Sequence, residues 1–87
     1  MGMIKAMREA RDLAMREVME YGLDLRINVC RQRHSRLVLT TPDGRLSRFV
    51  VFAGTPSCPR WLVHLRKDLR RVMREMDMVL KTLQEAR

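Results

Sequence analysis

The fold is decided by residues 37–52, LVLTTPDGRLSRFVVF. Both ends of this stretch are rich in apolar, β-branched and aromatic residues, which favour strands, and the sequence PDG at 42–44 is a strong turn signal. The stretch therefore predicts two strands, at about residues 36–41 and 45–52. Because so short a connection joins them, the two strands are expected to pair antiparallel.

A third strand and a helix are predicted on the N-terminal side of this hairpin. Apolar and polar side chains alternate through residues 24–30, which is typical of a half-buried strand. Before it, apolar residues recur at steps of three and four through residues 3–21, the spacing of an amphipathic helix. Gly22 follows where a glycine with left-handed backbone commonly ends a helix.

A second, longer helix is predicted at residues 57–84. Either Thr55 or Ser57 can cap it, since each precedes a proline by one or two positions and proline is tolerated in the first turn. The helix would be about 40 Å long, more than short strands can cover, so its last turns are expected to protrude or to pair with another surface. Its apolar seam alternates steps of three and four through Leu62, Leu65, Leu69, Val72, Met76, Val79 and Leu83.

These elements predict a single α+β domain over residues 1–87 with the order αβββα. The 87 residues are too few for two independent cores. Only one layer of apolar side chains is available, so both helices should cover one face of a three-stranded antiparallel meander. The other face of the sheet is expected to stay open.

Composition indicates an intracellular, cytoplasmic protein. The longest apolar run, residues 49–53, is far below the ~20 residues of a membrane span. The first twenty residues lack the apolar core of a secretory signal. The chain has only 2 cysteines, which do not form a disulfide framework, so a reducing compartment is expected.

Basic residues are concentrated in the middle of the chain. Residues 26–74 hold twelve Arg and Lys against two Asp, and the whole chain carries a net charge of +8. Arginine binds phosphate bidentately, so this segment predicts a nucleic-acid surface, although a solvated basic surface without a partner has the same composition. The candidate contacts are Arg31, Arg33, Arg36, Arg45, Arg48, Ser57, Arg60, Arg66, Lys67, Arg70, Arg71 and Arg74.

His34 is the one candidate catalytic residue. In a meander, the connection at 31–36 lies near residues 54–57 and the start of the long helix, whose free N–H groups attract phosphate. With an ordinary pKa of about 6.5, a histidine there serves as an acid or base in RNA cleavage, or it merely contacts phosphate. No second acid–base group is evident beside it.

The sequence also resembles a known family. RHS at 33–35, entering a strand, then TPDGR at 41–45, a further strand and a basic helix, are similar to the HicA-type mRNA interferase toxins of bacterial toxin–antitoxin systems. The resemblance covers about residues 20–75. It implies a fold like that of double-stranded-RNA-binding domains, RNA as the favoured nucleic acid, and His34 as the catalytic residue.

The chain departs from the toxin pattern in two positions and shares features with another group. Arg33 stands where that family has glycine, and Ser35 stands where a second histidine is common. GTPS at 54–57 and DLRR at 68–71 are similar to a stretch in small phage and prophage proteins of the same apparent fold. We therefore expect a phage-type RNA-binding protein, with a HicA-like RNA-cleaving toxin and a phage-encoded inhibitor of a host protein as alternatives.

Two further hypotheses concern metal and self-association. Zinc-type ligands occur at Cys30, His34, Cys58 and His64, but their spacing matches no established finger, so we expect neither metal nor cofactor. The end of the apolar seam outruns the sheet, so dimerisation or docking of a host protein is expected there. The residues concerned are Met76, Val79 and Leu83.

Overall fold

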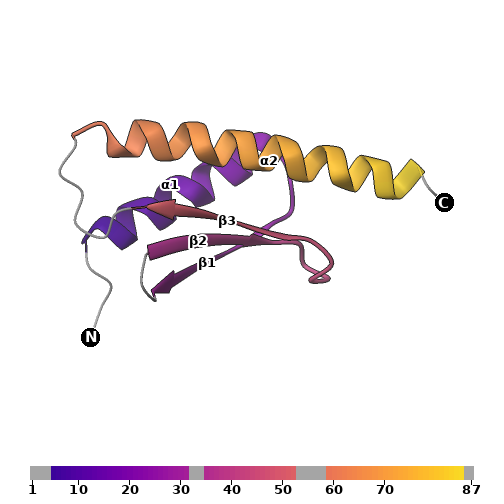
Figure 1. The fold of residues 1–87 in the computed structure, drawn as a ribbon, viewed down its shortest axis with the longest axis horizontal. Helices are drawn as coiled ribbons and strands as arrows, with labels where there is room; N and C mark the ends of the chain where they lie inside the picture. Colours follow the sequence, from indigo (N-terminus) through magenta and orange to yellow (C-terminus); the bar gives the residue numbers. More distant parts are fainter. Residues whose placement is uncertain (1–4, 32–34, 53–58, 86–87) are drawn as a thin grey trace.

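The computed structural model describes residues 5–31, 35–52 and 59–85, and Figure 1 shows their arrangement. This part of the chain forms α1 (Lys5–Tyr21), β1 (Arg26–Arg31), β2 (Ser35–Thr40), β3 (Ser47–Phe52) and α2 (Trp61–Glu85). The predicted αβββα order is confirmed. The strands begin or end one or two residues from their predicted bounds, and α2 begins at Trp61, whereas its predicted start at residue 57 lies outside the described residues.

The three strands form one antiparallel sheet in the order β1-β2-β3. Ile27 of β1 pairs with Leu39 of β2, and Leu37 of β2 pairs with Val50 of β3. Because successive side chains of a strand point to opposite faces, these four residues share one face. Both helices lie on that face, α1 against β1 and β2 and α2 against β3 and α1 (Figure 1).

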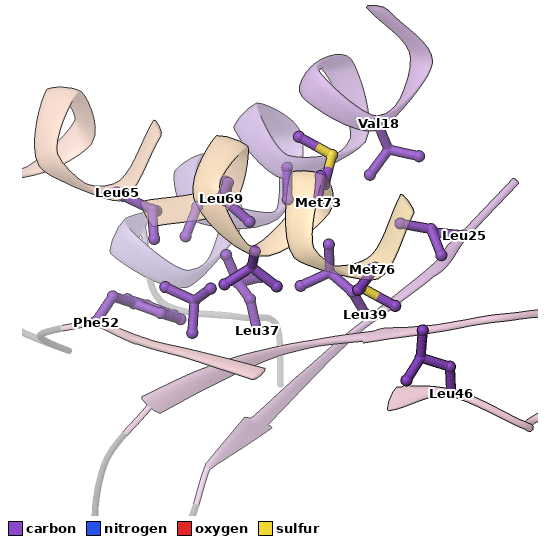
Figure 2. Packing of buried hydrophobic residues seen from close by; sticks show 14 of the residues in the cluster. Val18, Leu25, Leu37, Leu39, Leu46, Phe52, Leu65, Leu69, Met73 and Met76 are labelled. Carbon is purple, nitrogen blue, oxygen red and sulfur yellow. The ribbon is translucent and has the colours of Figure 1, made fainter. Parts of the chain in front are cut away.

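The core lies between the helices and this face of the sheet. Figure 2 shows Leu37, Leu39 and Phe52 directed from the strands toward Leu69 and Met76 of α2. Burial of such side chains contributes about 1.5–3 kcal/mol each and is the main force holding the layers together. The buried apolar residues are Met7, Ala10, Ala14, Val18, Leu25, Leu37, Leu39, Leu46, Val50, Phe52, Leu65, Leu69, Val72, Met73 and Met76.

Two glycines adopt left-handed backbone where the sequence predicted a helix end and a turn. Gly22 has φ +87° and its N–H donates to the carbonyl of Val18 at 3.1 Å, which closes the C-terminus of α1. Gly44 has φ +75° in the β2–β3 turn, and its N–H donates to the carbonyl of Thr41 at 2.9 Å. Both backbone conformations are accessible to glycine at little energetic expense.

Asp43 organises the same turn. Its carboxylate accepts the backbone N–H of Arg45 at 3.1 Å and the hydroxyl of Thr41 at 2.8 Å. These hydrogen bonds, the one from Arg45 first, stabilise the charged form and hold the pKa of Asp43 below its ordinary value of 3.8. The turn is therefore fixed by side-chain as well as backbone hydrogen bonds.

The C-terminal turns of α2 extend past the hairpin (Figure 1). A helix of 25 residues is about 37 Å long, whereas strands of six residues are about 20 Å long. Leu83 is accordingly exposed, and Val79 is partly buried against the core. Met76 corrects the sequence-based expectation, because it is fully buried inside the domain and has no surface to offer a partner.

Neither helix in the described part of the chain contains an apolar stretch long enough to span a membrane.

Candidate nucleic-acid interface

A row of basic side chains, here called the outer row, begins in the turn before α2 with Arg60 and continues on α2 with Lys67, Arg71 and Arg74. All four are exposed, and the three on the helix lie on the side opposite the buried Leu69. Their spacing of seven, four and three residues aligns them along one face of a helix. The row thus presents four positive charges in a line, with His64 exposed among them.

Arg66 and Arg70, which the sequence also predicts as nucleic-acid contacts, are turned toward α1. The Nε atoms of Arg66 and Arg70 lie 2.7 and 3.1 Å from the two carboxylate oxygens of Glu17, whose side chain is buried. Arg70 also approaches Glu20 at 3.9 Å. Their guanidinium groups hold α2 to α1, so we leave both residues out of the candidate interface.

The outer row has fewer acidic partners than Arg66 and Arg70 have. Within the described residues, Lys67 and Arg74 form no ion pair, and Arg71 has only Asp68 at 3.7 Å, an exposed pair of the kind that contributes about 0–1 kcal/mol. Among the described residues, Glu17 and Glu20 of α1 form their ion pairs with Arg66 and Arg70 and none with the outer row, although Arg74 borders the same hollow between the helices.

The remaining basic residues of the predicted interface lie elsewhere. Arg45 is exposed in the β2–β3 turn. Arg48 is exposed on β3, where it pairs with Leu39 and donates from Nη1 to the carbonyl of Ser47 at 2.8 Å. Arg36 lies on β2, on the side of the sheet away from the helices. The basic residues of the middle segment that the structure describes consequently do not form one surface.

The side of the sheet away from the helices is here called the open face. Its residues alternate with those of the core along each strand. Within the described strands this face has two arginines and neither Asp nor Glu. It consists of Arg26, Asn28 and Cys30 from β1, Arg36, Val38 and Thr40 from β2, and Ser47, Phe49 and Val51 from β3.

Phe49 is the most unusual residue of the open face. It is 53% exposed, and the guanidinium carbon of Arg36 lies 4.8 Å from the centre of its ring. Sequence reasoning missed it as a site residue, although four consecutive apolar residues at 49–52 are a signal that both faces of a strand are apolar. A solvated sheet face normally carries polar side chains instead.

Several predicted site residues lie outside the part that the structure describes. These are Arg33, His34 and Ser57, together with the side chain of Arg31. The hypothesis that His34 is catalytic therefore remains a prediction from the sequence.

The four zinc-type ligands of the sequence are only partly described. Cys58, like His34, is outside the described residues, whereas Cys30 lies on the open face and His64 on the exposed side of α2. These two side chains are separated by the sheet and by α2. Within the described ranges, His, Cys, Asp and Glu form no group of three that could hold a metal ion.

Trp61 packs at the edge of the core. Its ring and that of Phe52 are stacked, with centroids 6.3 Å apart and planes inclined by 23°. The side chain is partly buried against the core cluster, as is typical of an aromatic residue in the first turn of a packed helix.

Comparison of the chain with protein-family models, with curated proteins and with solved structures finds no match. The resemblance to HicA-type toxins accordingly stays a prediction.

Proposed function

We propose that this protein binds nucleic acid, with RNA favoured, and that the outer row of α2 contacts the phosphate backbone. The observation that carries the proposal is the difference between the two sides of α2. Glu17 and Glu20 neutralise the arginines on the side facing α1, while the outer row keeps its charge. The preference for RNA rests on the sequence resemblance.

The row is unfavourable for the isolated protein. Lys67 and Arg71, and Arg71 and Arg74, are like charges four and three residues apart, and each such pair destabilises a helix by about 0.2–0.5 kcal/mol. A phosphate backbone removes this repulsion and releases its own counterions. Arginine is well suited to the task because its planar group donates two parallel hydrogen bonds to phosphate.

The test is a salt titration with a matched pair of triple variants. One variant replaces Lys67, Arg71 and Arg74 by glutamine, and the other replaces Lys5, Arg8 and Arg16 of α1, which are also exposed. Both variants lose the same charge, so a difference between them reports position. Affinity for a labelled RNA is measured by fluorescence anisotropy between 50 and 200 mM salt.

We expect the α2 variant to bind RNA more weakly. Its plot of log K against log salt should also be less steep by about three, one unit for each phosphate contact that is lost. The α1 variant should change the slope much less. Equal effects of the two variants would mean that only net charge matters and would contradict the assignment to α2. If the unaltered protein fails to bind RNA and DNA at 50 mM salt, the proposal is wrong and the protein-inhibitor alternative gains support.

A further inference from the structure

We infer that the open face of the sheet binds single-stranded RNA by stacking an unpaired base against Phe49 and Arg36. The inference rests on the proposed function and extends it, because it names a second surface and the form of RNA that this surface accepts. The outer row contacts backbone, which single and double strands share. The open face would contact bases, which only unpaired strands present.

The first step of the argument is the apolar character of β3 on this face. Phe49 and Val51 are 53% and 48% exposed, although neither contributes to the core. An exposed aromatic ring beside an exposed β-branched residue is an apolar patch on a face that water would otherwise cover. Such a patch is stabilised when a flat apolar partner covers it.

The second step is the charge of the same face, which selects the partner. In the described strands, Arg26 and Arg36 are its charged residues, and acidic side chains are lacking. A second copy of this face would bring the guanidinium groups of both copies together, which is repulsive. A nucleic acid is complementary in both respects, since its bases are flat and its backbone is negative.

The third step is the arrangement of Arg36 over the ring of Phe49. The guanidinium carbon is 4.8 Å from the ring centre, which is a cation–π contact, and the Nε atom is buried without a hydrogen-bond partner within the described residues. Bases stack on aromatic rings and on guanidinium planes alike. A base can therefore extend the existing stack while the outer nitrogens of Arg36 reach its phosphate.

Hydrogen-bonding groups lie around this stack on the neighbouring strands. Asn28 pairs with Val38 on one side, and Val38 pairs with Phe49 on the other, so the amide is two strands away from the ring. The hydroxyl oxygens of Thr40 and Ser47 lie 3.2 Å apart at the hairpin end of the face. These amide and hydroxyl groups can bind base edges without excluding any particular base, so we expect modest sequence preference.

The experiment compares a 12-nucleotide single-stranded RNA with a duplex of the same sequence. Phe49→Ala removes the ring, Phe49→Leu removes the ring but keeps an apolar side chain, and Phe49→Trp keeps a ring. Leu83→Ala is the matched control, because Leu83 is 48% exposed on the C-terminal turns of α2, away from this face. Circular dichroism and thermal unfolding confirm that each variant is folded.

We expect Phe49→Ala and Phe49→Leu to weaken single-strand binding by about 5- to 150-fold, the range for loss of one base–aromatic stack. Duplex binding should change by less than about twofold, and Phe49→Trp and Leu83→Ala should bind as the unaltered protein does.

Four results would overturn the inference. Unchanged single-strand affinity in both ring-less variants would remove the stacking site, while the salt titration would still test the outer row separately. Equal losses for single strand and duplex would show that the face does not select bases. A change of sedimentation coefficient in Phe49→Ala would identify the face as a contact between copies of the chain. If no RNA binds at all, the inference falls together with the proposed function.

Discussion

Glu17 is a charged side chain in a position that the helical spacing reserves for the core. It is 5% exposed and lies on the buried side of α1 with Ala10, Ala14 and Val18. A buried carboxylate is tolerated only when it is paired and hydrogen-bonded, and Arg66 and Arg70 meet this requirement from α2. The two arginines keep about half of their side-chain surface in water, so their own desolvation is incomplete.

Glu17→Ala is expected to lower the free energy of unfolding by about 1.5–3 kcal/mol, the range for hydrogen bonds to charged groups. The loss stays below the 3–5 kcal/mol of fully buried pairs, roughly, because both arginines can rehydrate. Urea unfolding followed by circular dichroism measures it. Glu9→Ala is the control, since Glu9 meets Lys5 at 3.9 Å on the helix surface and should contribute less than about 0.5 kcal/mol. Equal losses would show that Glu17 is not a special link between the helices.

The burial of apolar side chains changes along α2, although its apolar seam is regular in the sequence. Met76 and Leu83 occupy equivalent seam positions one heptad apart, yet Met76 is fully buried and Leu83 is 48% exposed. The helix is simply longer than the sheet below it. The spacing of apolar residues predicted the helix and its overhang, but it could not show where the covering layer ends, because that depends on tertiary packing.

The buried surface of α2 is also wider than a heptad seam. Met73 lies outside the predicted seam and is fully buried, because α2 packs against α1 as well as against β3. A helix with two packing partners buries a broader stripe than one with a single partner. The same cause explains why Arg66 and Arg70, predicted from the sequence as contacts for nucleic acid, meet α1 instead.

Met76→Ala and Leu83→Ala separate the packed part of α2 from its overhang. Met76→Ala leaves a cavity and should cost about 2–5 kcal/mol, which corresponds to a fall in Tm of roughly 10 °C or more. Leu83→Ala should change stability by less than about 0.5 kcal/mol. Thermal unfolding of both variants provides the comparison. A large loss at Leu83 would contradict an exposed overhang and would mean that these turns are covered in solution, which sedimentation of the same variant would reveal.

The complete domain has two candidate binding surfaces on opposite sides of its two layers. The outer row lies on the side of α2 that faces away from the sheet, and the open face is the side of the sheet that faces away from the helices. Across its two shorter axes the molecule measures only 25 and 21 Å. A flexible single strand can bend around a body of this width and reach both surfaces, whereas a stiff duplex contacts one side at a time. The αβββα order and the open face were predictable from the sequence, but the division of its basic residues between two sides required the packing.

Catalysis is a separate property of the whole protein, and the sequence-based hypothesis for it concerns His34. We expect the unaltered protein and His34→Ala to leave a long structured RNA intact, and we expect the variant to bind it only a few-fold more weakly, since one contact among several is lost. Gel electrophoresis after incubation and anisotropy measure the two effects. Cleavage by the unaltered protein that disappears in the variant would favour the HicA-like alternative, and cleavage by both would indicate a contaminating nuclease.

The contact between α1 and α2 also determines the order in which the chain can acquire its structure. Glu17 and Arg70 are 53 residues apart, whereas each strand pairs with its neighbour in the sequence. At about 5–20 residues per second, a ribosome needs roughly 3–10 s between adding Glu17 and adding Arg70. During that interval α1 and the meander have no second helix to cover Leu37 and Leu39. A nascent chain that stops before residue 61 would therefore expose part of the apolar face of its sheet and be prone to aggregate. We therefore expect quality control by chaperones and proteases to act most strongly on chains that lack α2.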